Sequence, residues 1–323
     1  MDGSAGYTSR APKTIRVELE RLSIGRVIAT PQDEYGHAFD RVLRIVVGSE
    51  RGAVLQGSAY SPMVLVPVRG AVRLADGETT RVLRQGQLAI IEPAPSLQID
   101  GGTQALWIAL VAAPLVWRQL FDAATENPVP EPLLLPAVHA IDRSACRAIV
   151  RIARDAARSD GGAFERTPAL IRFATRLVDL QSSFDTYIRR CPGRSLSQRR
   201  GVFLRLQRAR IAMETSHTRG HGVAELARMS SYSPCHFVRT FRAVFGDTPH
   251  TLLTEHRLLK ARRLIHETRL SITEVARASG FEDRCAFARS FKQRFGVTAT
   301  ETRRRGGSRS DHAADCTGLS NAR

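Results

Sequence analysis

The 323-residue sequence contains few cysteines and no long apolar run. No stretch approaches the roughly 18 consecutive apolar residues of a membrane span, and no apolar run follows the first residues as in a signal peptide. The cysteines form no C-x-x-C pair, so neither a disulfide framework nor a zinc site is indicated. We therefore expect a cytoplasmic protein with no membrane partner. Its five cysteines are scattered: Cys146, Cys191, Cys235, Cys285 and Cys316.

Histidine pairs are also missing from the N-terminal region. Two imidazoles two residues apart in a strand point to the same side of a sheet and can share a metal ion. Residues 14–126 hold only His37, which is therefore expected in a loop or on the surface. We expect no metal, no other cofactor and no enzyme activity.

Acidic residues are scarce in the C-terminal part of the chain. From Arg194 onward lie 25 of the 48 Lys and Arg residues but only 11 of the 31 Asp and Glu residues. Such a concentration of positive charge is expected in a protein that binds a polyanion. Charge alone does not separate this interpretation from a solvated arginine-rich surface.

Short β-rich runs separated by turn residues fill the N-terminal region. They predict an antiparallel barrel or jelly roll over residues 14–126, after a disordered leader at 1–13. Asp76-Gly77 supplies the positive φ angles of a tight hairpin turn. A barrel of this kind has an interior that can hold a small ligand. The predicted strands are Leu43–Val47, Met63–Val66, Ala71–Leu74, Leu88–Ile91 and Leu106–Val111.

Helical periodicity replaces the strand pattern over residues 127–190. A proline-rich linker leads to a predicted helix at Ala145–Arg158, and Pro168 begins a second helix. This helical pair either packs on the barrel or forms a homodimer interface. Cys191–Ser195 is interpreted as a hinge. A C-terminal domain is then predicted over residues 195–305, followed by a disordered tail at 306–323.

One pattern occurs twice in the C-terminal domain. Ala224–Ala227 returns 49 positions later as Thr273–Ala276, and His236–Phe241 returns 50 positions later as Ala286–Phe291. Each copy predicts a short helix, a turn and a longer helix, with one extra residue in the second turn. This is the helix-turn-helix arrangement that reads duplex DNA. One long helix, Pro249–Glu267, is predicted to join the copies. The fold class is therefore α+β with two domains, the second all-α.

The longer helix of each copy has an inner and an outer face. Ser233 and Asp283 are predicted N-caps of these helices, and Ser271 is the predicted N-cap before the second copy's short helix. Gly280 is placed in a turn that needs a positive φ. At 100° per residue, one side of each helix collects Phe or Val, and the other side collects the predicted DNA-facing residues. These are Cys235, Val238, Arg239 and Arg242 in the first copy, and Arg284, Cys285, Ala288, Arg289 and Lys292 in the second.

The segment from Leu206 to Arg304 resembles the DNA-binding domain of the AraC/XylS family of bacterial transcription regulators. The motifs that carry the resemblance are Ser233-Pro234-Cys235-His236-Phe237, Phe245-Gly246-Asp247-Thr248-Pro249, Arg257–Ile265, Leu270–Ala276 and Phe291–Thr298. The resemblance implies base reading by the outward positions of both longer helices. A weaker likeness of the N-terminal region to cupin-like effector domains implies that the barrel is the regulatory domain.

Together these features predict a transcription regulator that acts as an activator. We expect it to bind promoter DNA, RNA polymerase and a small-molecule effector, and to associate with the nucleoid when it is bound to DNA. Two alternatives remain open: a cupin-type enzyme with a DNA-tethering tail, and a barrel that binds a partner protein. We call each of the two helix-turn-helix copies a head. The second head has more polar outward groups and is expected to contribute more to the choice of DNA sequence. Ala299-Thr300 stand where the family usually has proline and an aromatic residue, which predicts a looser end of the second unit.

Overall fold

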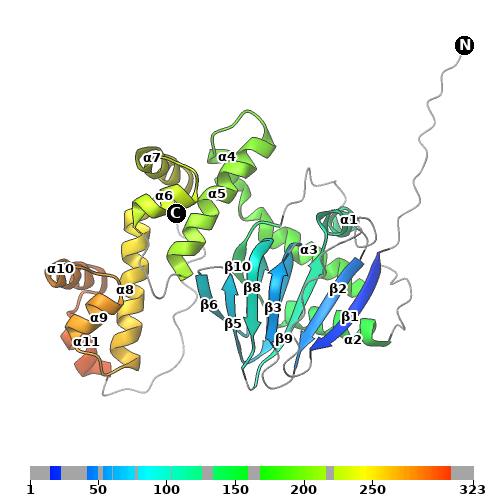
Figure 1. The fold of residues 1–323 in the computed structure, drawn as a ribbon, viewed down its shortest axis with the longest axis horizontal. Coiled ribbons are helices and arrows are strands. Elements are labelled where there is room, and N and C mark those ends of the chain that lie inside the picture. The colour runs from blue at the N-terminus through cyan, green and yellow to red at the C-terminus, as the bar shows by residue number, and fades with distance from the viewer. Residues whose placement is uncertain are drawn as a thin grey trace, which may run out of the picture. The chain divides into compact units, whose positions relative to one another are not determined.

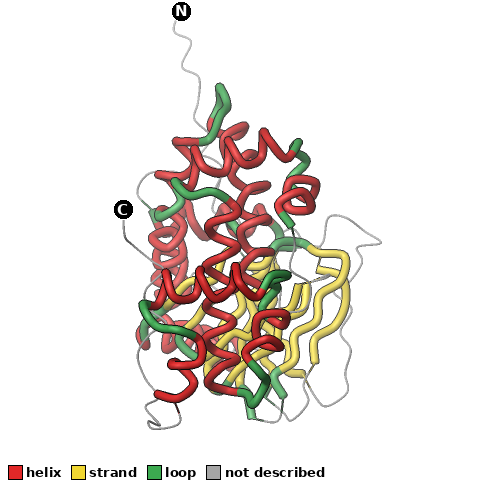
Figure 2. Tube along the Cα trace, turned by 90° about the vertical axis from the view of Figure 1, so that its left-hand side faces the viewer, coloured by secondary structure: helices red, strands yellow, loops and turns green. Residues whose placement is uncertain are grey.

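The protein consists of two compact units, Met1–Ile211 and Ala212–Arg323. The computed structural model describes residues 15–22, 42–49, 54–59, 61–76, 79–102, 104–125, 134–158, 168–215 and 222–306. His37, Cys316, the predicted leader and the tail beyond residue 306 lie outside the described residues. Within the described part, all strands belong to the first unit. Figure 2 shows these strands in yellow.

Two sheets form the first unit. The six-stranded sheet has the order β1-β2-β9-β4-β7-β10, and the four-stranded sheet has the order β3-β8-β5-β6. The strands are β1 (Arg16–Leu22), β2 (Val42–Gly48), β3 (Val54–Ala59), β4 (Met63–Arg69), β5 (Ala71–Asp76), β6 (Thr79–Arg84), β7 (Gln87–Ile91), β8 (Ala94–Asp100), β9 (Leu106–Ala112) and β10 (Ala137–Ala140).

The six-stranded sheet is buried on both faces. In β4, Met63 and Leu65 belong to one apolar core with residues of the four-stranded sheet, whereas Val64 and Val66 belong to the other core. Successive side chains of a strand point to opposite faces, so a strand covered on both sides needs a continuous apolar run. This explains why β4 begins with four apolar residues in succession rather than with alternation.

Three helices form the outer layer of this unit. They are α1 (Pro114–Ala124), α2 (Arg143–Arg158) and α3 (Pro168–Ser182), and their apolar sides complete the second core. Figure 1 shows α2 and α3 behind the strands of the sheet. The α2 helix buries Ile149 and Ile152 completely. The layers are therefore sheet, sheet and helices.

The predicted strand-rich region followed by an all-helical region is confirmed. All five predicted strands are present, and β5 and β6 pair up to Asp76 and Thr79, as the predicted hairpin requires. The jelly-roll alternative of the fold prediction is confirmed, since the described strands form two sheets rather than a closed barrel. One detail differs from the prediction: β1 pairs with β2 in parallel, so the sheets are not purely antiparallel.

A further pair of helices, α4 (Asp185–Arg190) and α5 (Leu196–Thr215), follows α3. The predicted hinge between them lies inside the first unit, because that unit extends to Ile211. Backbone groups of this segment are held by α5: Gln198 Oε1 accepts from the Arg194 amide at 2.8 Å, and Arg199 Nε donates to the Gly193 carbonyl at 3.0 Å.

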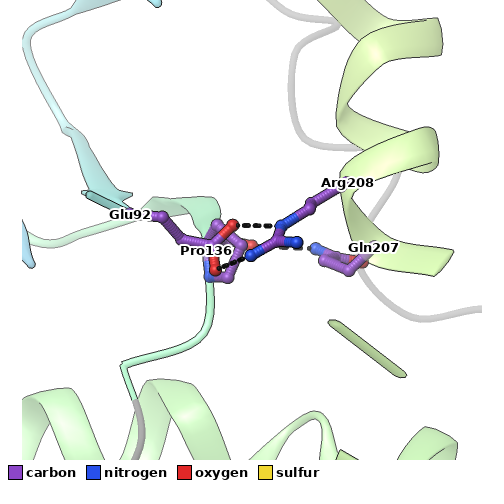
Figure 3. Close-up of polar contacts among 4 residues, drawn as sticks. All are labelled: Glu92, Pro136, Gln207 and Arg208. Atoms are coloured by element: carbon purple, nitrogen blue, oxygen red, sulfur yellow. Dashed lines mark hydrogen bonds and ion pairs between the residues drawn. The ribbon is translucent and has the colours of Figure 1, made fainter. Parts of the chain in front are cut away.

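The first unit holds α5 by a polar clamp (Figure 3). Arg208 donates from two nitrogens to the two carboxylate oxygens of Glu92, at 2.8 and 3.0 Å, and the Gln207 amide donates to the Pro136 carbonyl at 3.1 Å. Bidentate pairing of this kind fixes orientation as well as distance. The clamp joins α5 to the ends of β7 and β10, more than 70 residues earlier in the chain.

The second unit is helical throughout its described residues. Its helices are α6 (Val223–Met229), α7 (Pro234–Phe245), α8 (Pro249–Glu267), α9 (Ile272–Ala278), α10 (Arg284–Phe295) and α11 (Ala299–Gly306). The predicted long helix is α8, with the predicted bounds. The two predicted helix-turn-helix units are α6–α7 and α9–α10.

Candidate nucleic-acid interface

The two longer helices, α7 and α10, are positioned by aromatic side chains on their inner faces. Phe237 and Phe241 in α7 and Phe287 and Phe291 in α10 are fully buried. Phe295, one turn after Phe291 on the same side of α10, is half-buried, and the guanidinium groups of Arg262 and Arg294 lie 5.0 and 5.4 Å from its ring centroid. Burial of one face leaves the other free for a ligand.

The predicted DNA-facing residues all lie outside these cores. Val238 is half-buried and the others are exposed: Cys235, Arg239 and Arg242 on α7, and Arg284, Cys285, Ala288, Arg289 and Lys292 on α10. Arg239 reaches back one turn to the Cys235 sulfur at 3.9 Å. Each helix therefore presents an arginine at the same place in the repeat, Arg239 and Arg289.

The turn in each unit ends the short helix in the same way. The Tyr232 and Phe281 amides donate to Ala227 and Ala276, and the Ser231 and Gly280 amides donate to Arg228 and Arg277. This pair of bonds is the Schellman motif, in which one residue adopts a left-handed conformation. The predicted positive φ of Gly280 is confirmed at 90°. Its counterpart in the first turn is a non-glycine residue, Ser231, with φ 58°.

Exchanging the two turn residues should move the stability of the two heads in opposite directions. Glycine removes the Cβ penalty of the left-handed region, so Ser231→Gly should stabilise α6–α7 by about 0.5–1 kcal/mol after the greater freedom of unfolded glycine is deducted. Gly280→Ser should destabilise α9–α10 by at least as much. Native-state hydrogen exchange of the amides in each head measures both changes, and each variant's unaltered head serves as its control. Equal responses of both heads to either change would contradict this.

Side-chain capping distinguishes the two heads. Ser271 and Glu274 form a reciprocal capping box at α9, and the Asp283 carboxylate accepts from the Cys285 and Ala286 amides at 2.9 and 3.0 Å. These hydrogen bonds lower the pKa of Glu274 and of Asp283. At α6 and α7, neither Gly222 nor Ser233 provides a side-chain cap bond. The predicted caps at Ser271 and Asp283 are confirmed, whereas Ser233 occupies the N-cap position without capping.

The end of the second unit is also capped. The Thr298 hydroxyl accepts from the Glu301 amide at 3.2 Å, and the Glu301 carboxylate accepts from the Thr298 amide at 2.8 Å. This capping box begins α11 without the proline that the family usually has. The predicted loosening of this end is therefore wrong.

The α8 helix connects the two heads and is fastened to the second. Arg294 Nε donates to the Glu255 carboxylate at 2.8 and 2.7 Å, and Leu258, Ala261 and Ile265 share the core of α9 and α10. The sequence offered no signal for the Arg294–Glu255 pair, because its partners lie 39 residues apart. The nineteen residues of α8 rise about 28 Å along the helix axis.

No group of three or more His, Cys, Asp or Glu side chains that could hold a metal ion occurs in the described part of the chain. The four cysteines within it are free thiols. Every helix of the described segments is too short or too polar to cross a membrane.

Comparison with known proteins identifies relatives of the second unit. A helix-turn-helix domain model matches residues 226–305. The transcriptional regulator GlxA of Rhizobium meliloti is 40% identical over 96 residues, which are 30% of each protein. The probable transcription factor PqrA of Proteus vulgaris is 32% identical over 96 residues, which are 29% of this chain and 79% of PqrA.

A similar solved structure is a transcriptional regulator with an AraC-type DNA-binding domain from Chromobacterium violaceum. It has 26% identity and a TM-score of 0.29, and the match covers 32% of this chain and 93% of that one. The chain spans about a third of the length of the regulators GlxA and VirF that it matches. The matched region is the one that contains both heads.

Proposed function

Because the chain belongs to the AraC/XylS family of transcription regulators, we propose that it binds promoter DNA through both helix-turn-helix units and activates transcription in response to a small molecule. The α7 and α10 helices enter successive major grooves. Their outer faces, which carry the nine DNA-facing residues named above, contact base edges and phosphates. RNA polymerase is the second macromolecular partner of the DNA-bound protein.

The observation that carries the proposal is the repeated arginine. Arg239 and Arg289 occupy the same position on two helices whose inner faces are fixed by buried phenylalanines. Arginine can donate two hydrogen bonds to the N7 and O6 atoms of guanine in the major groove. Two such groups on rigid supports are suited to reading two separated base pairs.

The proposed effector site lies between the two sheets of the first unit. The core there is apolar, and the indole Nε1 of the fully buried Trp107 has no hydrogen-bond partner among the described residues. A buried donor without an acceptor costs free energy, which an acceptor atom of a ligand would recover. An apolar molecule with one hydrogen-bond acceptor fits this chemistry.

Homodimerisation through the helical region at 127–190 is a further part of the proposal. The described helices of that region include α2 and α3, and α2 turns an arginine-bearing face to solvent. An isologous contact through that face would place like charges opposite each other. We therefore propose that the dimer contact involves α3 rather than α2.

DNA binding should show the salt dependence of phosphate neutralisation. The full chain is expected to shift a promoter fragment from upstream of its own gene, with log affinity falling by about 0.9 per log unit of salt for each phosphate contacted. A fragment of equal length with shuffled sequence is the control and should bind more weakly. Equal affinity for both fragments would refute sequence-specific recognition. An effector added to the same preparation should raise the melting midpoint by mass action.

A further inference from the structure

One helix of the first unit carries an unusual row of charges. The α2 helix contains arginines at positions 143, 147, 151, 154 and 158, and all five are exposed. Successive members are three or four residues apart, so at 100° per residue the five fall within an arc of about 80°. Over fifteen residues the row is about 22 Å long. We call it the α2 arginine row.

The helix is held so that this row faces outward. Its opposite side buries Ala145, Ile149, Ile152, Ala153 and Ala156 in the core shared with the six-stranded sheet. The Asp142 carboxylate caps its first turn by accepting from the Ala145 amide at 2.9 Å. Rotation of α2 about its axis would expose this apolar side, so the orientation of the row is fixed by the core.

The arginine row opposes the stability of its own helix. Like charges three or four residues apart repel, and the row contains four such neighbouring pairs. Asp155 is the one acidic residue of the helix. Within the described ranges, no ion pair joins any of the five arginines to a carboxylate. A bound polyanion would turn this repulsion into attraction.

We propose that the α2 arginine row binds the phosphate backbone of duplex DNA, as a contact separate from the two reading heads. The row consists entirely of arginine, whose planar guanidinium matches the oxygens of a phosphate better than the ammonium of lysine does. Its length of about 22 Å corresponds to about six base-pair steps along the axis of B-DNA, so the row can contact several backbone phosphates. Binding there is independent of base sequence, because phosphate contacts position a protein without reading bases.

Other occupants fit the row less well. A membrane-surface helix inserts its apolar face into lipid, but the apolar face of α2 is already buried in the protein. A protein interface normally has an apolar or aromatic centre, and the α2 sequence contains no aromatic residue. A second copy of the chain would bring two arginine rows together. Charge complementarity therefore favours nucleic acid.

The inference rests on the proposed DNA-binding function and is tested in the full chain. The variant Arg147→Gln/Arg151→Gln/Arg154→Gln should reduce the slope of log affinity against log salt by about 0.9 for each phosphate that is no longer neutralised, up to about 2.7. Affinity for the promoter fragment and for the shuffled fragment should fall by the same factor. The matching lysine variant, which keeps the charge, should retain most of the slope.

A second triple variant removes the same charge elsewhere in the unit. Arg73→Gln/Arg84→Gln/Arg118→Gln alters three exposed arginines outside α2 and should leave the slope nearly unchanged. An unchanged slope in the α2 variant, or an equal fall in both variants, would overturn the inference. Loss of binding to phosphatidylglycerol vesicles with unchanged DNA affinity would assign the row to a membrane surface instead. If the unaltered protein fails to bind DNA, the proposed function itself fails and the inference falls with it.

Discussion

Replacing Arg289 with alanine is expected to weaken binding to the specific DNA site by about tenfold to 100-fold, while binding to random DNA changes much less. A bidentate arginine contact with guanine contributes about 1–3 kcal/mol of discrimination. Arg239→Ala should act in the same direction at the other half-site. Arg289 should have the larger effect, because α10 is expected to contribute more to sequence choice. It presents Arg284 and Lys292 beside Arg289, whereas the other outward residues of α7 are Arg242 and the weakly hydrogen-bonding Cys235 and Val238.

The control for this prediction is Arg263→Ala. Arg263 is exposed on α8, where it faces Glu267 on the same helix at 3.7 Å and lies outside both reading helices. Its replacement removes the same charge and should affect specific and random DNA alike. Fluorescence anisotropy with an operator fragment and a shuffled fragment gives both affinities at one salt concentration. If Arg239→Ala and Arg289→Ala weaken both fragments equally, the two arginines contact phosphate and do not read bases.

Gly48→Ala should destabilise the first unit by about 3 kcal/mol or more, the upper end of the usual cost of overpacking a core. Gly48 is the last residue of β2 and pairs with Trp107 of β9. A Cβ at residue 48 would overlap the indole ring, and the ring is fully buried with Gly101 on another side. The indole cannot move away without opening the core between the sheets.

Tryptophan fluorescence isolates this effect. Both tryptophans of the chain, Trp107 and Trp117, lie in the first unit. A unit of this size loses about 2–4 °C of melting midpoint per kcal/mol. The double variant Gly48→Ala/Trp107→Leu, followed through Trp117, should lose less stability than the sum of the two single changes. If the destabilisation of the double variant equals the sum of the two single changes, overlap with the Trp107 indole does not cause the destabilisation by Gly48→Ala.

The same substitution elsewhere should have the opposite sign. Gly201 lies inside α5, and a Cβ built there meets no atom within 4 Å. Alanine in a helix interior is favoured over glycine by about 0.8–1 kcal/mol, so Gly201→Ala should raise the midpoint. A lower melting midpoint in both Gly48→Ala and Gly201→Ala would contradict the expectation that a Cβ is costly beside Trp107 and favourable in α5.

Elements with a clear apolar pattern were predictable: strands buried on both faces carry continuous apolar runs, and helices with one buried face carry a single apolar stripe. The five predicted strands and the α2 helix begin and end within three residues of their predicted bounds, α3 begins at the predicted Pro168, and both helix-turn-helix units are present. The α5 helix was not predicted as an element, since its buried residues, which include Phe203, Gln207 and Ala209, do not form one apolar stripe. The β3 and β6 strands carry polar residues at several positions and gave no strong signal.

The candidate interface could be predicted because the same pattern of residues occurs in two helices. A helix with phenylalanine on one side and arginine on the other is unremarkable alone, but Arg239 and Arg289 recur at the same place. Contacts between distant segments could not be predicted from the sequence. The Glu92–Arg208 clamp joins residues 116 positions apart, and no local sequence pattern indicates that either residue has such a partner. Open sheets could not be distinguished from a closed barrel for the same reason, since closure depends on which strands pair.

The extra residue of the second turn lies at a position where a helix-turn-helix unit can differ in length without a change in its helices. In the first head Tyr232, the last residue bonded back to α6, is followed directly by the N-cap Ser233. In the second head Glu282 separates Phe281, which bonds back to α9, from the N-cap Asp283. The extra residue lies after the last hydrogen bonds of the short helix and before the N-cap of the longer helix. It therefore changes the length of the turn while both helices of the unit keep their pattern of hydrogen bonds and caps.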